Sequence, residues 1–197
     1  MKNEYYYDLE ELLIYPFNFK IMKTEYEVKI LDIDINNIKA KLDNLWAKYI
    51  WENLQKRYVY DFNPINNNKW IRLRQVWEKV ELTIKEITDD SITWTKELEV
   101  NVGDFELTNN ILKELWYIPK AYQENKRISY MLDWVNIEID FWPLIPPYLE
   151  IEWKDEIEVE KMVNKLWYKI SDTTSINTTK VYIKYGIDLT SIDFLRF

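Results

Sequence analysis

Residues 25–29 read Glu-Tyr-Glu-Val-Lys, and this stretch sets the phase for the strands that follow. In a β-strand, successive side chains point to opposite faces of the sheet. Glu25, Glu27 and Lys29 therefore share one face, whereas Tyr26 and Val28 share the other. Such a strand separates an ionic environment from an apolar one.

The same arrangement recurs in later strands of the chain. The ionic residues that share a face within each strand are Arg72 with Arg74, Glu81 with Lys85, Glu97 with Glu99, Glu138 with Asp140, and Glu150 with Glu152. The opposite faces are apolar, as Ile71, Leu73, Leu149 and Ile151 illustrate. A single strand of this kind is typical of a solvated face with alternating ion pairs. Six strands in phase favour a shared polar interior, with helices covering the apolar side.

The alternation predicts an α+β fold with a meandering antiparallel sheet. Strands are expected at residues 24–30, 48–62, 71–76, 79–87, 91–100, 118–132, 135–141 and 148–152. Helices are expected at residues 36–45, 104–115, 156–166 and 178–185, and a polar loop at residues 63–68. Eight strands can close into a barrel whose lumen holds side chains or one small ligand.

The first 21 residues do not share this pattern. They lack a clear period and precede a second methionine, Met22. We interpret residues 1–21 as an N-terminal extension or a misassigned start, and residues 22–197 as the domain. A short helix over residues 8–15 that packs on the domain is the alternative.

Composition excludes several kinds of chemistry. The 197 residues include neither histidine nor cysteine, so imidazole bases, thiolates and disulfides are absent. Any metal must have oxygen ligands, which favours Mg²⁺, Mn²⁺ or Ca²⁺. The net charge of −8 argues against nucleic-acid and anionic-membrane partners. No apolar run is long enough to cross a bilayer and the N-terminus does not resemble a signal peptide, so a cytoplasmic location is expected.

A shared polar interior needs a ligand that satisfies both carboxylates and cations, because burying either unpaired is costly. A polyphosphate with a divalent metal does so. The metal neutralises carboxylates and bridges phosphate oxygens, while Arg and Lys bind the remaining oxygens. Arginine suits this task because its planar guanidinium pairs with phosphate through two hydrogen bonds.

The order of the charged strands carries a resemblance to a known family. The relevant stretches are an ExExK motif at residues 25–29, a basic strand at 69–74, a strand with an inward lysine at 81–85, an acidic strand at 96–99, Arg127, and acidic strands at 138–140 and 149–152. Together they resemble the CYTH superfamily, the triphosphate tunnel metalloenzymes, over about residues 24–189. Within that superfamily, these stretches resemble those of bacterial class IV adenylyl cyclase-like proteins. The resemblance implies an eight-stranded antiparallel β-barrel tunnel with flanking helices.

The resemblance also implies residue roles. The metal ligands, for Mg²⁺ or Mn²⁺, would be Glu25, Glu27, Asp140, Glu150 and Glu152. The triphosphate would be bound by Lys29, Arg57, Arg72, Arg74, Lys85 and Arg127. Glu97 and Glu99 would either contact the metal or hold the basic residues in place, and Glu138 is a further candidate without an assigned role. Arg57 and Arg127 depend on register, since a slip of one residue would turn them outward.

Three functions are compatible with these residues. The first is hydrolysis of a triphosphate, with inorganic triphosphate, thiamine triphosphate or ATP as candidate substrates. Without histidine, the proton acceptor would be a carboxylate, a desolvated lysine or a hydroxide on the metal, which makes Glu27 and Lys29 the catalytic candidates. The second is class IV adenylyl cyclase chemistry, which forms cyclic AMP and pyrophosphate from ATP. The third is a non-catalytic polyphosphate-binding module, against which the many carboxylates argue. An aromatic run at residues 5–7 could join a homodimer contact, but a disordered tail is the favoured interpretation.

Tryptophan stands where glycine is expected. The chain has ten tryptophans and two glycines, although average usage would give roughly fourteen glycines. Trp46, Trp116 and Trp167 each follow an amphipathic helical pattern, at the position where helices commonly end on a left-handed glycine. Trp134 follows Asp133 between two alternating runs, as glycine does in a hairpin turn, and Trp77 lies at another hairpin tip. We hypothesise that these tryptophans correspond to UGA codons in a genetic code that reads UGA as glycine.

Overall fold

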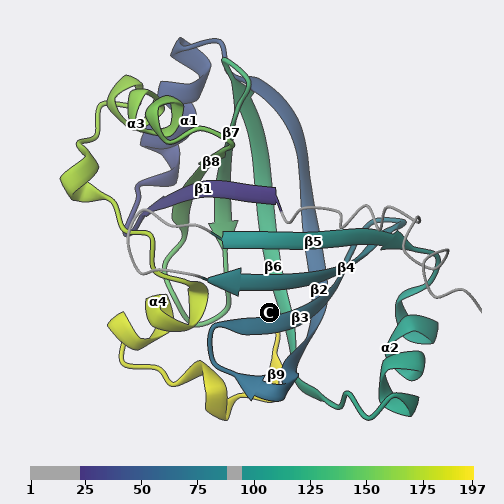
Figure 1. The fold of residues 1–197 in the computed structure, drawn as a ribbon. Coiled ribbons are helices and arrows are strands. Elements are labelled where there is room, and N and C mark those ends of the chain that lie inside the picture. Colours follow the sequence, from purple (N-terminus) through teal and green to yellow (C-terminus); the bar gives the residue numbers. More distant parts are fainter. Residues whose placement is uncertain (1–22, 88–94) are drawn as a thin grey trace, which may run out of the picture.

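A computed structural model describes residues 23–87 and 95–197, and its main feature is a curled antiparallel sheet (Figure 1). The strands are β1 (Lys23–Ile30), β2 (Lys48–Asn66), β3 (Lys69–Val76), β4 (Lys79–Ile87), β5 (Thr95–Val102), β6 (Pro119–Leu132), β7 (Val135–Phe141), β8 (Tyr148–Trp153) and β9 (Phe194–Leu195). The extension at residues 1–21, including the alternative helix at 8–15 and the aromatic run at 5–7, lies outside the described residues.

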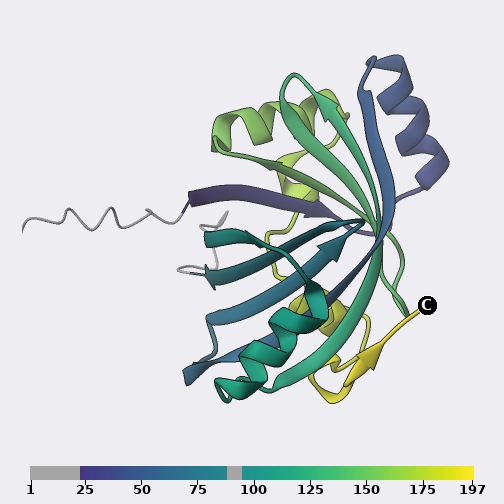
Figure 2. The ribbon, with the colours of Figure 1, turned by 90° about the vertical axis from the view of Figure 1, so that its right-hand side faces the viewer.

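The strand order closes the sheet on itself. The order is β2-β3-β4-β5-β1-β8-β7-β6-β9, and β2 also pairs with β6. The first eight strands therefore form an antiparallel barrel, which Figure 2 shows from the side. β1 lies between β5 and β8 and is antiparallel to both, while β9 adds a short parallel pairing to β6. The predicted eight-stranded barrel with flanking helices is confirmed.

Four helices pack around the barrel: α1 (Ile35–Asn44), α2 (Phe105–Glu114), α3 (Glu156–Lys165) and α4 (Thr178–Lys184). Short 3-10 turns, η2 (Ile170–Asp172) and η3 (Leu189–Ser191), flank α4. Each helix begins after an Asp or Asn whose side chain accepts hydrogen bonds from the first turn, at Asp34, Asp104, Asp155 and Asn177. No helix in the described part of the chain has the length and apolar character needed to span a membrane.

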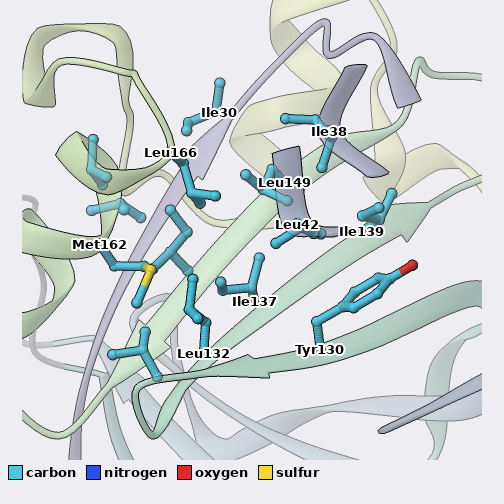
Figure 3. Packing of buried hydrophobic residues seen from close by; sticks show 14 of the residues in the cluster. Ile30, Ile38, Leu42, Tyr130, Leu132, Ile137, Ile139, Leu149, Met162 and Leu166 are labelled. Atoms are coloured by element: carbon cyan, nitrogen blue, oxygen red, sulfur yellow. The ribbon is translucent and has the colours of Figure 1, made fainter. Parts of the chain in front are cut away.

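The largest hydrophobic core lies between two helices and the outer face of the barrel. α1 contributes Ile38 and Leu42, and α3 contributes residues such as Met162. They pack against outward side chains of β1, β6, β7 and β8, among them Ile137 and Leu149 (Figure 3). Burying this face against helices leaves the opposite, ionic face of the same strands directed inward. A second cluster lies between α2 and strands β2–β4, and a third surrounds α4 and β9.

Replacing Leu42 with alanine (Leu42→Ala) tests the contribution of this core. The side chain is fully buried, at 0% exposure. Loss of its contacts, together with the cavity left behind, is expected to lower the free energy of unfolding by about 2–5 kcal/mol. Urea denaturation measures the change. Leu107→Ala, on α2 at 61% exposure, is the matched control and should change stability by less than about 0.5 kcal/mol. Equal effects of both changes would contradict the assignment of the core.

Two local features, the stretch at residues 63–68 and strand β9, differ from the sequence expectations. The prediction of a polar loop at residues 63–68 is wrong in part. β2 continues to Asn66, and Asn66 pairs with Lys69 across a two-residue turn. Pairing with β3 outweighs the loop-forming composition there, although the register is irregular between Asp61 and Asn66. β5 is described from Thr95, and the part of its expected range before that lies outside the described residues. β9 was not predicted, because two residues carry no measurable periodicity.

Candidate functional site

The inward faces of the barrel strands enclose a cavity of about 1370 Å³. All eight strands of the closed barrel contribute lining residues. The stretch from Ser175 to Lys180, which leads into α4 and forms its first turn, also contributes, together with Leu189 and Thr190. The cavity carries side chains of both charge signs, so its electrostatics depend on which of them neutralise each other.

Three carboxylates gather on the wall formed by β1 and β8. Glu27 lies directly opposite Glu152 in the antiparallel pairing, and Glu150 lies two residues away on the same strand. Each offers a carboxylate oxygen, and these atoms lie within 4.8 Å of one another. We call Glu27, Glu150 and Glu152 together the carboxylate group. Like charges directly opposite on adjacent strands destabilise a sheet unless a cation compensates them.

The environment shifts the pKa values of Glu150 and Glu152 in opposite directions. Burial, followed by the charge of Glu150, raises the pKa of Glu152. Burial alone would also raise the pKa of Glu150, but Arg127 and Lys29 outweigh that effect and lower it to about 2. Glu150 therefore stays ionised, and its charge is a cost to Glu152 that a bound cation would remove.

Lys29 stands beside this carboxylate group. Its side chain is buried, and its Nζ forms an ion pair with Glu27 and lies 3.4 Å from Glu150. Its backbone is also fixed, because the N–H of Lys29 donates to the carbonyl of Thr174 at 2.7 Å and the N–H of Thr174 donates back at 2.9 Å. The segment before α4 is thus attached to the same strand.

Arg127 on β6 is held by three carboxylates. Its Nε and Nη2 donate to Asp140 at 2.8 and 2.6 Å, and Nη2 also donates to Glu150 at 2.9 Å. Nη1 forms an ion pair with Glu138. Burial by itself would lower the pKa of Arg127, but Asp140 and Glu150 raise it well above its ordinary value. Arg127 therefore organises the carboxylates of β7 and β8.

Two other cations are paired with carboxylates at short range. Arg74 donates to Glu81 through Nε at 3.1 Å and Nη2 at 2.6 Å. Lys85 forms an ion pair with Glu97. Arg72 is held more loosely, since its Nη2 lies 3.8 Å from Glu97 and 3.6 Å from Glu99, and its buried Nε has no hydrogen-bond partner.

Arg57 on β2 differs from the other basic residues predicted to bind phosphate because it forms no ion pair with any described carboxylate. Its Nη2 donates to the side-chain oxygens of Asn125 and of Gln55, the latter at 3.3 Å. Its guanidinium lies over the Trp142 ring at 4.7 Å, and its buried Nε has no partner. Burial, and then the charges of neighbouring arginines led by Arg72, hold the pKa of Arg57 well below its ordinary value. An anionic ligand would relieve this destabilisation.

The Arg74–Glu81 pair yields a pH-dependent prediction for stability. Burial alone would raise the pKa of Glu81, but Arg74 and Lys79 outweigh that effect and lower it from 4.5 to about 2. A carboxyl group with a lowered pKa stabilises the folded state above its unfolded pKa, and this contribution is lost as pH falls through the folded value. The difference in free energy of unfolding between the unsubstituted chain and Glu81→Gln should therefore be greatest above pH 4.5 and shrink toward pH 2.

Urea unfolding of both chains across this pH range measures that difference. Glu86→Gln is the matched control, because Glu86 lies on the same strand with a longer ion pair of 3.5 Å to Lys69. A difference between the natural chain and Glu81→Gln that stays constant with pH would contradict the assigned pair.

The structure brings most of the predicted site residues to the cavity. The lining residues include Glu27, Lys29, Arg57, Arg72, Arg74, Lys85, Glu97, Glu99, Arg127, Glu138, Glu150 and Glu152. Asp140 is fully buried behind Arg127, where it accepts a hydrogen bond from Asn125 at 3.0 Å, and burial raises its pKa. It does not join the group formed by Glu27, Glu150 and Glu152. The side chain of Glu25 lies outside the described residues.

Several residues around the site were not singled out from the sequence. Gln55 and Asn125 hold Arg57, and Trp142 stacks against it. Gln55 shares the inward phase of Arg57 on β2, and Asn125 shares that of Arg127 on β6, so the period-2 pattern could have identified both. Trp142 follows β7 directly, where strand periodicity no longer applies.

The carboxylate group fits a hard divalent cation. Its donors are carboxylate oxygens close enough to share one ion, and a cation bound there would offset the burial and the Glu150 charge that raise the pKa of Glu152. Mg²⁺ and Mn²⁺ favour such oxygen ligands. The part of the chain that the structure describes offers no other group of three carboxylates of this kind.

Comparison with known proteins places this geometry in a family. The profile of the CYTH domain matches residues 23–182. A conserved hypothetical protein from Pyrococcus furiosus has a similar structure, with a TM-score of 0.68 and 25% identity over 78% of this chain and 97% of that chain. None of the curated proteins matches the sequence.

Two further solved structures share the fold at lower identity. A candidate adenylate cyclase from Vibrio parahaemolyticus superposes with a TM-score of 0.69 at 12% identity, covering 82% of this chain and 99% of that chain. A candidate adenylyl cyclase from Hippeastrum, described as having a dominant triphosphatase activity, gives 0.59 at 13% identity over 84% and 96% of the two chains.

Proposed function

The chain belongs to the CYTH domain family, and from this premise we propose that it is a metal-dependent hydrolase that cleaves a phosphoanhydride bond of a triphosphate in the barrel cavity. One observation carries the proposal. The carboxylate group lies on β1 and β8, whereas Arg57 and Arg72, which lack close carboxylate partners, lie on β2 and β3. In the closed strand order these pairs of strands form opposite walls of the same cavity.

We assign the metal-binding role to Glu27, Glu150 and Glu152. When bound, Mg²⁺ or Mn²⁺ would neutralise these carboxylates and the charge on the phosphate oxygens of the substrate. Arg127 positions Glu150 through their hydrogen bond and Lys29 approaches it from the other side. The chain thereby holds one ligand oxygen in place before any ion binds.

We assign the phosphate-binding role first to Arg57 and Arg72. Both are buried, both have a lowered pKa through burial and neighbouring arginines, and both retain an unpartnered Nε–H. A phosphate oxygen can accept these N–H groups without displacing a carboxylate. Arg74 and Lys85 are already neutralised by Glu81 and Glu97, so they contribute less binding energy per contact.

Hydrolysis requires a water molecule in line with the bond that breaks. The water oxygen forms a bond to the terminal phosphorus while the bridging P–O bond breaks, so inorganic triphosphate would yield phosphate and pyrophosphate. Lys29 is engaged as a cation with Glu27 and Glu150, which suits it to hold a phosphate oxygen better than to accept a proton. The proton of the water would pass to a carboxylate of the carboxylate group, Glu27, Glu150 or Glu152.

The alternative is the cyclase reaction, in which the 3′-hydroxyl of ATP attacks its own α-phosphate and pyrophosphate leaves. The candidate cyclases from Vibrio parahaemolyticus and Hippeastrum share the fold. The two reactions use the same metal and phosphate-binding residues and differ in which phosphorus is attacked.

One assay separates the functions. The purified protein is incubated with inorganic triphosphate or ATP, each with Mg²⁺, Mn²⁺ or a chelator, and the products are identified. Metal-dependent release of phosphate supports the hydrolase. Formation of cyclic AMP with pyrophosphate would identify a cyclase, and metal-dependent binding without turnover would identify a binding module. Either of these results would overturn the proposed hydrolysis.

A further inference from the structure

Three helices end with tryptophan in a left-handed backbone conformation. Trp46, Trp116 and Trp167 follow α1, α2 and α3 with φ values of 58°, 67° and 61°. The backbone N–H of Trp46 donates to the carbonyl of Asp43 at 3.0 Å, and the N–H of Ala47 donates to the carbonyl of Leu42 at 2.9 Å. The other two helices end with the same pair of hydrogen bonds. This pair defines the Schellman motif, whose left-handed position is usually glycine.

The fourth helix provides an internal comparison. α4 ends with Gly186 at a φ of 75°. The N–H of Gly186 donates to Ile183 at 3.0 Å, and the N–H of Ile187 donates to Tyr182 at 3.1 Å. The backbone conformation and its two hydrogen bonds are therefore the same at all four helix ends. The left-handed residue is glycine at one of them and tryptophan at three.

Two hairpin turns also have tryptophan at a position that glycine commonly occupies. Asp133 and Trp134 connect β6 to β7, and both have positive φ, at 50° and 72°. Type I′ turns require this at both central residues, and Asp-Gly is a preferred pair. Trp77 and Glu78 connect β3 to β4, and of the two only Trp77 has a positive φ, at 53°. A positive φ at the first central residue alone fits the type II′ turn, which places glycine there.

Tryptophan gains little packing at these five positions. Trp77 makes an edge contact with Trp51 at 6.1 Å and Trp167 lies 5.7 Å from the Lys41 ammonium, but all five side chains face mainly solvent. Trp46, Trp116 and Trp134 are 91%, 87% and 74% exposed, and Trp77 and Trp167 are also exposed. A bulky residue in the left-handed region carries a steric penalty that its packing does not offset here. The other non-glycine residues with positive φ in the described chain are Asp32, Asp133 and Leu144. Aspartate tolerates this region better than larger residues do.

Trp142 shows the opposite behaviour. It is only 5% exposed, its φ is not positive, and its ring contacts Arg57 and Tyr182. This position uses the size of the indole, so Trp142 contrasts with the five exposed tryptophans at positive φ.

We infer that the natural protein has glycine at positions 46, 77, 116, 134 and 167, specified by UGA codons that its cells read as glycine, and tryptophan at position 142, specified by UGG. The inference is independent of the proposed function, because it depends on backbone conformation and exposure alone.

Mass spectrometry of the protein from its own cells tests this directly. The tryptic peptide of residues 128–154 contains both position 134 and position 142. Fragment ions are expected to show glycine at the first and tryptophan at the second, so the peptide carries its own control. The peptides that cover positions 46, 77, 116 and 167 should each show glycine. Tryptophan at position 134, or glycine at 142, would overturn the inference.

Thermal unfolding of recombinant chains provides a second measurement. Combining Trp46→Gly, Trp77→Gly, Trp116→Gly, Trp134→Gly and Trp167→Gly should raise Tm by at least about 5 °C, because five strained residues are relieved. Trp142→Gly in that background should lower Tm. A combined variant whose Tm is unchanged or lower than that of the printed sequence would contradict the inference.

Discussion

Replacing Glu27 with glutamine (Glu27→Gln) is expected to lower kcat/KM for inorganic triphosphate by at least about 100-fold. The change keeps the shape of the side chain but removes one of the three charges whose oxygens lie within 4.8 Å of one another. Metal affinity should fall as well, so the concentration of Mg²⁺ or Mn²⁺ that gives half-maximal rate should rise. Initial rates measured over a series of metal concentrations report both effects.

Without metal, the same variant should change the free energy of unfolding only slightly. Relief of the repulsion between Glu27 and Glu152 offsets the loss of the Glu27–Lys29 ion pair, and Lys29 keeps Glu150 as a partner. Glu52→Gln is the matched control. Glu52 is on β2, is exposed, and pairs with Lys126 outside the cavity. Near-normal turnover in Glu27→Gln, or an equal loss in Glu52→Gln, would show that the metal site has been misplaced.

Arg127→Met and Arg57→Met are expected to separate two roles that the sequence groups together. Arg127→Met leaves Glu138, Asp140 and Glu150 without their shared partner. Removing one member of a buried ion-pair network costs about 3–5 kcal/mol. Arg57→Met removes a buried cation that no described carboxylate neutralises but leaves Asn125 and Gln55 without this donor, so the free energy of unfolding should fall by less than in Arg127→Met, about 1–3 kcal/mol.

Activity should respond differently from stability. Arg57→Met should lower kcat/KM by about 100-fold while the protein remains folded, since a preorganised donor to the substrate is lost. Urea denaturation and initial rates, measured on the same preparations, provide the two readouts. Arg57→Lys is a control that retains the charge but not the planar pair of donors, and it should recover part of the activity. A strongly destabilised Arg57→Met with unimpaired specific activity would assign Arg57 to structure instead.

The phase of the charged residues could be predicted from the sequence, because strand geometry fixes it. Once Val28 and Ile30 are assigned to the core, Glu27 and Lys29 must face the other way, and the structure places them at the cavity. The same reasoning correctly turned Arg72 and Arg74 inward. It also identified the helix ends at Trp46, Trp116 and Trp167, because a helical pattern that stops requires a particular backbone conformation after it.

The pairing between charges could not be predicted in this way. It depends on strand order, and nothing local indicates that β1 lies between β5 and β8. The resemblance implies a triphosphate-binding role for Arg127, but it does not indicate the ion pairs that Arg127 forms with Glu138 and Glu150 from two other strands. Asp140 was grouped with the metal ligands although it faces Arg127 and Asn125. These distinctions require three-dimensional neighbours, which period-2 reasoning does not supply.

The position of β1 also has a consequence for biosynthesis. The strand that carries Glu27 and Lys29 is the first strand described in the chain, but its partner β8 ends only at Trp153. On the ribosome, β1 must therefore wait until most of the polypeptide has emerged before it can complete its pairing, and the contact of Lys29 with Thr174 comes later still. Such long-range contacts slow folding and leave unpaired strands exposed meanwhile. We expect nascent chains that end before Trp153 to depend on chaperones and to lack the assembled group of Glu27, Glu150 and Glu152.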